Sequence, residues 1–150
     1  MAKRLILGVD FDGTVVTHRF PAVGQDAPHA ARVIKRLIKE KGFIIVLNTM
    51  RSHKTCYNPT TGKTCSKIEG KRLGLTTTLD DAVNWFEKNS IPLSGINKSP
   101  GQENWTDSPK VYATHYVDDA AIGSPIITLE NGEECVDWLT IEQIIFENNR

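Results

Sequence analysis

The chain has 150 residues, of which 39% are hydrophobic, enough for one compact core and too few for two independent domains. Lys plus Arg and Asp plus Glu each number 18, so the net charge is zero, unlike that of a nucleic-acid coat protein or a polybasic membrane anchor. No apolar run approaches the roughly 20 residues that span a bilayer, and the first ten residues lack the cleavage region of a signal peptide. We therefore expect a single domain over residues 1–150, located in the cytoplasm and without membrane partners.

Strands and helices alternate along the first half of the chain. Residues 4–10 (RLILGVD) are a mostly apolar run that predicts a strand, and residues 28–42 place apolar side chains at helical spacing. Residues 43–49 (FIIVLNT) begin with five consecutive apolar residues, as expected of a central parallel strand buried on both faces. The basic segment 52–74 interrupts the alternation, and its centre, YNPTTGKT, predicts the turn of a small hairpin.

The second half of the chain is less regular. Residues 78–89 predict a helix capped by Thr78, and a short strand follows over 91–97. Residues 97–110 contain two prolines and a glycine, so we predict no long helix there. The remaining predicted elements are a strand over 114–119, an edge strand over 125–129 and a helix over 140–149 with a Thr140–Gln143 capping box. This order predicts an α/β, Rossmann-like, three-layer fold around a central, mainly parallel sheet of about five strands.

Polar side chains follow the predicted strands where the strands end. The residues are Asp10 and Asp12 after the first strand, Thr49 after the second, Lys98 after the third, and Asp118 and Asp119 after the fourth. The carboxyl ends of parallel strands meet at one edge of a sheet, where ligands bind. Because carboxylates held together repel one another, a cation is expected between them. Oxygen ligands without a cluster of His or Cys indicate Mg²⁺.

These residues resemble the motifs of the haloacid-dehalogenase (HAD) superfamily of hydrolases. The sequence DFDGT, at residues 10–14, matches the Asp-x-Asp-Gly-Thr motif of that superfamily completely. FIIVLNT matches a second motif that ends in Thr or Ser, and YVDD matches an acidic pair after an apolar strand. The resemblance runs from Leu5 to about Thr128 and is strongest to small, nearly capless phosphatases of bacteria and phages. It implies a HAD-like fold and a Mg²⁺-dependent phosphatase.

The resemblance implies a role for each matching residue. Asp10 is the expected nucleophile, which attacks phosphorus to form an aspartyl-phosphate, and Asp12 is the expected general acid and base. Thr49 is expected to hydrogen-bond a phosphoryl oxygen, and Gly13 and Thr14 to bind substrate. The expected ligands of Mg²⁺ are Asp10, Asp12 through its backbone carbonyl, Asp118 and Asp119.

The resemblance also implies a catalytic lysine, for which the sequence offers two candidates. Lys98 ends the third predicted strand, and Lys110 lies eight residues before Asp118 in the turn DSPK. We favour Lys110 as the catalytic lysine and Lys98 as a substrate-binding residue. Arg51, close to Thr49, is a second candidate for substrate binding, and a plain surface charge is the alternative.

Five further side chains have no motif to assign them. Trp85 is expected in the core together with Trp138, whereas Trp105, in a polar loop, is a candidate for substrate contact. Cys56 and Cys65 are compatible with a disulfide, a zinc site or a reduced hairpin, and we favour the reduced hairpin because no further metal ligands are evident.

The lengths of the connecting segments bear on the substrate. In the superfamily that the motifs resemble, large cap domains are inserted at such positions, and the insertion over 52–74 is too short for one, so the resemblance implies an open site. An open site beside a basic insertion fits a phosphorylated small molecule, a nucleotide or a nucleic-acid end as the substrate. Two alternatives from other classes are a phospho-accepting signalling domain, which needs no second acid, and an inactive module that binds metal or phosphate.

Overall fold

The computed structural model describes residues 4–147. Its elements are β1 (Ile6–Val9), α1 (Ala30–Lys41), β2 (Ile44–Leu47), β3 (Thr55–Asn58), β4 (Lys63–Ser66), α2 (Lys67–Arg72), α3 (Thr78–Lys88), β5 (Gly95–Ile96), η1 (Gln102–Asn104), β6 (His115–Val117), β7 (Ile126–Thr128), β8 (Glu134–Val136) and α4 (Trp138–Glu147). The last helix starts two residues before the predicted Thr140, because Asp137 accepts a hydrogen bond from the Thr140 N–H at 3.3 Å. The capping box predicted at Thr140 is therefore wrong, and positions 148 and 149 of that predicted helix lie outside the described residues. Within residues 4–147, no helix combines the length and apolar character needed to cross a membrane.

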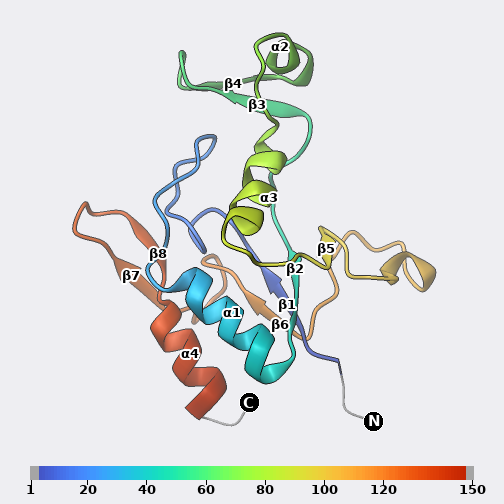
Figure 1. Ribbon diagram of the computed structural model, residues 1–150, viewed down its shortest axis with the longest axis vertical. Coiled ribbons are helices and arrows are strands. Elements are labelled where there is room, and N and C mark those ends of the chain that lie inside the picture. Colours follow the sequence, from blue (N-terminus) through green and yellow to red (C-terminus); the bar gives the residue numbers. More distant parts are fainter. Residues whose placement is uncertain (1–3, 148–150) are drawn as a thin grey trace.

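The central sheet has four strands in the order β5-β2-β1-β6, and all of its neighbouring strands are parallel (Figure 1). Leu7 in β1 lies between Ile45 of β2 and His115 of β6. The prediction of a fifth strand over 125–129 in this sheet is wrong. Instead β7 pairs antiparallel with β8, an unpredicted strand, in a separate hairpin. Gly132, at φ 86°, allows the chain to fold back there before it reaches the edge of the central sheet.

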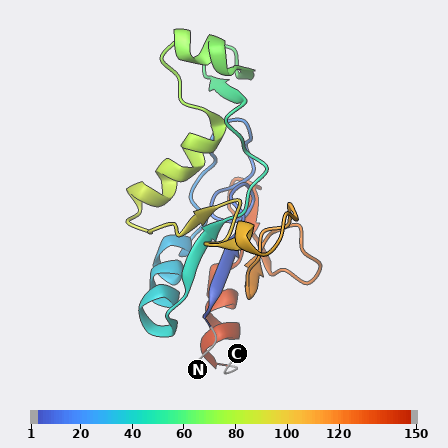
Figure 2. The same ribbon diagram turned by 90° about the vertical axis from the view of Figure 1, so that its right-hand side faces the viewer.

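The two faces of the central sheet are covered differently. Because side chains alternate along a strand, Leu7 of β1 packs into one core with α1, α3 and α4, while Ile6 packs with Val46 and Val111 on the other face. That second face is covered by the chain that leads into β6, which contains the short η1 (Figure 2). The prediction of no long helix over 97–110 is thus confirmed. The predicted third layer of helices is replaced by this irregular segment.

Helix ends at α1 and α3 follow from local capping. Gly42 ends α1 in the left-handed conformation, at φ 74°, and its N–H donates to the Ile38 carbonyl at 3.1 Å. The cap of α3 is Thr77, whose hydroxyl accepts a hydrogen bond from the Asp80 N–H at 3.1 Å. The prediction of Thr78 as the cap is wrong by one position, since Thr78 is the first helical residue and is buried.

Residues 52–74, here called the arm, project from the carboxyl end of the sheet (Figures 1 and 2). The predicted hairpin is confirmed as β3 and β4, in which Cys56 lies directly opposite Cys65 and both cysteines are free. α2 follows the hairpin, with Ser66 as its cap. A Cβ on Gly70 of α2 would lie 2.1 Å from the Cys56 sulfur, so only glycine allows this helix to pack so closely against β3.

Candidate active site

The chain leaves β1 through a tight turn that carries both carboxylates of DFDGT. The Asp10 N–H donates to the Val117 carbonyl of β6 at 3.0 Å, which fixes Asp10 at the carboxyl edge of the sheet. Gly13 follows at φ +81°, and a Cβ on it would lie 2.3 Å from Asp119 Oδ2. Glycine is therefore required both for the turn and for the approach of Asp119. Its predicted contact with substrate stays a prediction.

Three carboxylates meet at this edge. Asp10, Asp118 and Asp119 each offer one oxygen, and these oxygens lie within 4.8 Å of one another. Burial, the hydrogen bond with Asp119 and the negative charge of Asp118 raise the pKa of Asp10 to about 8. The Thr14 hydroxyl lies 3.1 Å from Asp10 Oδ2 and accepts a hydrogen bond from the Asp119 N–H, also at 3.1 Å. Thr14 is fully buried and braces the carboxylates, an arrangement that does not fit its predicted contact with substrate.

Asp12 lies outside the carboxylate cluster and is held by Arg51. The Nε and Nη2 groups of Arg51 donate to the two carboxylate oxygens of Asp12, each at 2.8 Å. The other donors of Arg51 reach the backbone carbonyls of Pro21, Ala22 and Thr78. All five N–H groups of this buried guanidinium are thereby engaged. The prediction that Arg51 binds substrate does not fit this arrangement, because no donor is left for a phosphate.

Thr49 is positioned by a residue that sequence reasoning missed. Its N–H donates to Asn97 Oδ1 at 2.8 Å, across 48 positions of sequence. Its hydroxyl oxygen accepts a hydrogen bond from the Arg51 N–H at 3.1 Å, so the hydroxyl proton is available to a ligand. Only the neighbouring places of β2 and β5 in the sheet bring Asn97 to Thr49, and no sequence motif marks that contact.

The predicted carboxylates and Thr49 line one open pocket of about 380 Å³. Its lining residues are Asp10, Asp12, His18, Phe20, Thr49, Met50, Arg51, Asp118, Asp119 and Ala120. The polar groups come from the ends of β1, β2 and β6, as the sequence predicts for a parallel sheet. Phe20 and Met50 are 46% and 98% exposed and form an apolar rim that the sequence analysis did not identify.

Neither candidate lysine lines this pocket. Lys110 Nζ lies 5.8 Å from the centroid of the Tyr116 ring. Lys98 directly follows Asn97, the residue that hydrogen-bonds the Thr49 backbone. Lys98 therefore adjoins, in sequence, the residue that anchors Thr49, whereas Lys110, the lysine favoured from the sequence, lies over Tyr116.

Trp105 does not belong to the site. It is 64% exposed, packs edge-to-face on Tyr112 and lines a hollow with Ile6 and Ile44. Since Ile6 and Ile44 begin β1 and β2, that hollow lies at the edge of the sheet opposite Asp10. The candidacy of Trp105 for substrate contact is therefore wrong.

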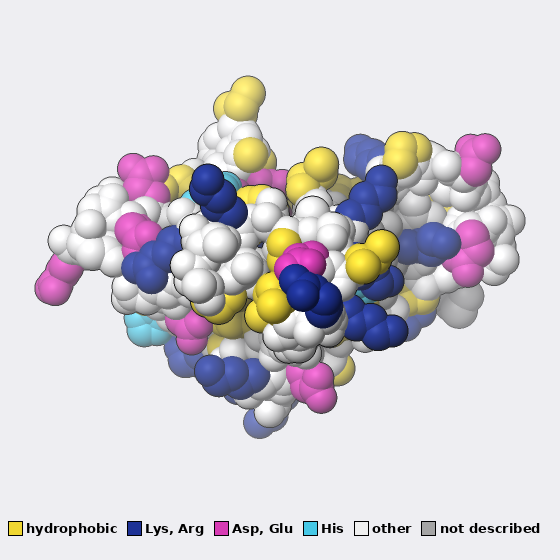
Figure 3. Space-filling model, turned by 90° about the horizontal axis from the view of Figure 1, so that it is seen from above, with side chains coloured by type: hydrophobic (Ala, Val, Ile, Leu, Met, Phe, Trp, Pro, Cys, Tyr) yellow, Lys and Arg dark blue, Asp and Glu magenta, His cyan; other side chains and the backbone are white. Residues whose placement is uncertain are grey.

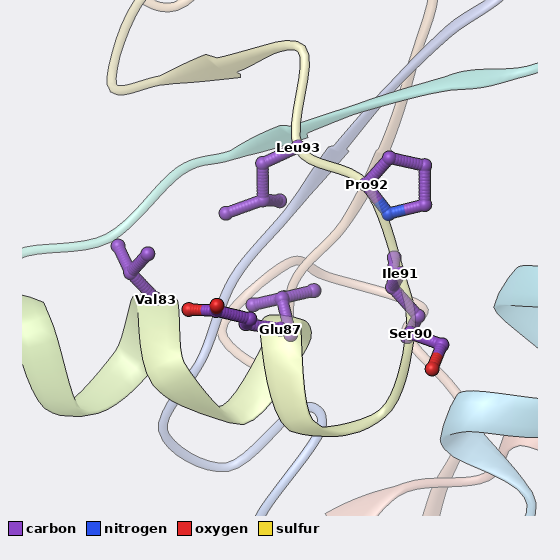
Figure 4. A pocket seen from close by; sticks show the side chains of 7 residues that line it. Val83, Glu87, Ser90, Ile91, Pro92 and Leu93 are labelled. Carbon is purple, nitrogen blue, oxygen red and sulfur yellow. The ribbon is translucent and has the colours of Figure 1, made fainter.

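Another hollow, of about 370 Å³, lies between the end of α3 and residues 90–93 (Figure 4). Its lining is mostly apolar, and Glu87 is the one charged residue in it. A catalytic pocket needs several convergent polar groups, which the pocket around Asp10 has and this hollow lacks.

Comparisons with known proteins bear on the fold. No family model matches the chain, and no curated protein matches it. Among solved structures, it is similar to the "conserved protein coded by locus from Bacteroides thetaiotaomicron", with 24% sequence identity over 97% of this chain and 93% of that chain, and a TM-score of 0.65. This similarity supports an α/β fold around a parallel four-stranded sheet, consistent with a Rossmann-like architecture.

Proposed function

We propose that the protein is a Mg²⁺-dependent phosphatase of the HAD type, which hydrolyses phosphomonoesters through an aspartyl-phosphate on Asp10. One observation carries the proposal. The two carboxylates of DFD have different surroundings although one residue separates them: Asp10 faces Asp118 and Asp119, whereas Asp12 faces Arg51. The first setting suits a nucleophile beside a metal ion, and the second suits a separate acid and base.

The carboxylate cluster fits a hard divalent cation. Its three members are Asp10, Asp118 and Asp119, and the raised pKa of Asp10 reflects in part their mutual repulsion. The described cluster contains only oxygen donors, which Mg²⁺ prefers. These three side chains, with the Asp12 carbonyl as a further predicted ligand, would hold the ion. When bound, Mg²⁺ supplies positive charge that favours ionised Asp10 and attracts the phosphate of the substrate.

The side chains of the pocket account for the steps of hydrolysis. The Asp10 carboxylate attacks phosphorus, the bond from phosphorus to the ester oxygen breaks, and that oxygen takes a proton from Asp12 and leaves as an alcohol. Asp12, now ionised, takes a proton from a water molecule whose oxygen attacks the aspartyl-phosphate, which releases phosphate and Asp10. The free hydroxyl proton of Thr49 donates to a phosphoryl oxygen in both steps.

Turnover of an aryl phosphate tests the proposal. With Mg²⁺ and p-nitrophenyl phosphate, we expect steady turnover by the wild type, none by Asp10→Asn, and a severe loss in Asp12→Asn. Asp107→Asn, an exposed aspartate away from the pocket, is the matched control and is expected to retain activity. Each variant is also compared by circular dichroism, so that a loss of turnover is separated from a loss of fold.

The same assay addresses both alternatives. Lasting phosphorylation of Asp10 without turnover would indicate a phospho-accepting signalling domain. A folded wild type that neither turns over nor becomes labelled would indicate a binding module, and either result contradicts the proposal. Near-normal turnover by Asp12→Asn would remove its role as acid and base.

A further inference from the structure

Positive charge is concentrated on the arm. Residues 52–74 contain five Lys or Arg and one Glu, so the arm carries a charge of +4 and the rest of this neutral chain carries −4. Glu69 pairs with Arg72 within α2. The other cations, Lys54, Lys63, Lys67 and Lys71, are exposed and take part in no ion pair within the described residues.

The arm and the pocket lie at the same end of the molecule. The arm begins directly after Arg51, which lines the pocket, and returns at Thr77, which bridges to Cys56. Arg51 also donates to the Thr78 carbonyl at 3.2 Å, so the base of the arm is fixed to the site. Figures 1 and 2 show the arm extending beyond the carboxyl ends of β1 and β2. Figure 3 views the molecule from this end, where Lys and Arg side chains are interspersed with hydrophobic and acidic ones.

The rim of the pocket is apolar although its floor is acidic. The Phe20 ring centroid lies 5.2 Å from the Arg51 Cζ, and Met50, which is 98% exposed, lines the same pocket. Nucleic-acid bases stack on aromatic rings such as that of Phe20, and the flexible thioether of Met50 suits contact with a flat leaving group. Exposed apolar side chains at the mouth of a phosphate pocket therefore favour a nucleotide as the leaving group.

We propose that the substrate is an oligonucleotide that ends in a phosphate monoester. The terminal phosphate enters the pocket of Asp10, the terminal nucleoside lies against Phe20 and Met50, and the following phosphates lie along the lysines of the arm. This inference rests on the proposed phosphatase activity. A free nucleotide would contact only the rim. Contact with the arm therefore distinguishes an oligonucleotide substrate from a free nucleotide.

The experiment compares kcat/KM for three substrates at low salt: an eight-nucleotide DNA with a 3′- or 5′-phosphate, the matching mononucleotide, and p-nitrophenyl phosphate. For the wild type we expect the phosphorylated DNA to exceed the mononucleotide at least tenfold. Its kcat/KM should fall with salt with a log–log slope of about −3, as four released counterions on a single strand predict. The arm variant changes four lysines to Gln: Lys54, Lys63, Lys67 and Lys71. It should lose both the preference for DNA over the mononucleotide and the salt dependence of kcat/KM.

A matched variant controls for the loss of four charges. This variant changes four lysines of α1 and α3 to Gln together: Lys35, Lys39, Lys41 and Lys88. It should keep the preference for DNA. Equal kcat/KM for DNA and mononucleotide, or an arm variant that keeps the preference, would overturn the inference. So would a phosphopeptide of equal charge that is hydrolysed more efficiently than the DNA.

A binding measurement separates this inference from the phosphatase proposal. The anisotropy of a fluorescent, phosphate-ended DNA is measured with Asp10→Asn, whose arm is intact, and with Asp10→Asn combined with the four arm substitutions. We expect tighter binding by the first protein. Turnover of p-nitrophenyl phosphate without DNA preference contradicts only the oligonucleotide, whereas DNA binding without any turnover contradicts the phosphatase.

Discussion

Arg51 holds Asp12 through two parallel hydrogen bonds of 2.8 Å, and it donates its remaining protons to backbone carbonyls. Two of those carbonyls belong to Pro21 and Ala22, in the loop over the pocket. The third belongs to Thr78, the first residue of α3. One guanidinium therefore joins the proposed acid and base to the loop and to the base of the arm. Each Asp12 oxygen keeps a lone pair, so the pair orients Asp12 without blocking proton transfer.

We predict that Arg51→Lys lowers kcat by about 10- to 100-fold with little change in KM, because an ammonium cannot reproduce the planar, two-bond contact with Asp12. The pH profile of kcat should also shift, which a purely structural role would not produce. Arg51→Met should cost about 3–5 kcal/mol in the free energy of unfolding, since it leaves the partly buried Asp12 carboxylate and several carbonyls without a partner. Arg32→Lys, in an exposed pair with Glu142, is the control for both measurements and should change neither. A kcat of Arg51→Lys close to that of the wild type would refute the positioning role.

The pKa of Asp10 predicts an unusual dependence of stability on pH in metal-free protein. Its folded value, about 8, lies above the ordinary aspartate pKa of 3.8, so the folded state binds more protons than the unfolded state between these values. The contribution of Asp10 to stability therefore falls as pH rises from about 4 to about 8 and is constant above that. Asp10→Asn, which stays neutral, should melt at a higher temperature than the wild type at pH 8, and the difference should shrink towards pH 4. Thermal unfolding with a chelator measures this, and a less stable Asp10→Asn at pH 8 would contradict it.

Mg²⁺ should raise the melting temperature of the wild type, because it binds the folded carboxylate cluster and not the unfolded chain. The increase should be larger at pH 8 than at pH 6, since the ligands must lose their protons to bind the ion. Asp118→Asn should reduce the increase, and Asp107→Asn, outside the cluster, should not. Differential scanning calorimetry at fixed ionic strength gives the values. An equal response in Asp118→Asn would place the ion elsewhere.

Lys98 is predicted to matter more for turnover than Lys110. Lys98 directly follows Asn97, which anchors the Thr49 backbone, whereas Lys110 lies over Tyr116. A cation that stabilises charge on the phosphoryl group is worth about 100-fold in kcat, so we expect a loss of that order for Lys98→Ala. Lys110→Ala and the control Lys88→Ala should stay close to the wild type with p-nitrophenyl phosphate. The opposite ranking would restore the preference drawn from the sequence.

The sequence was sufficient for the features that depend on local pattern. The apolar runs that became β1 and β2 bury alternate residues on both faces of the sheet, and the turn YNPTTGKT forms the hairpin of the arm. The convergence of Asp10, Asp118 and Asp119 was predictable because parallel strands end at one edge. A short apolar run such as 125–129 does not show which strand it pairs with. In the structure it pairs with β8, because the chain turns back at Gly132.

Contacts between distant residues account for most of what the sequence could not predict. Arg51 reaches Asp12 over 39 positions, and Asn97 reaches Thr49 over 48. Nothing in the spacing of these residues distinguishes an arginine that pairs with a carboxylate from one that binds phosphate. Thr14 was assigned to substrate because a motif records residue type and not burial, and its hydroxyl is enclosed by the carboxylates it braces.

The central claim is that Asp10 becomes covalently phosphorylated during turnover. The most direct measurement is rapid acid quenching of the enzyme with Mg²⁺ and p-nitrophenyl phosphate, followed by mass spectrometry of the peptide that contains residues 5–19. In the wild type we predict a transient phosphoryl group on Asp10, and in Asp12→Asn a longer-lived one, because the base that activates water for the second step is missing. Steady turnover with no phosphoryl group on Asp10, or with one on a different residue, would contradict the account.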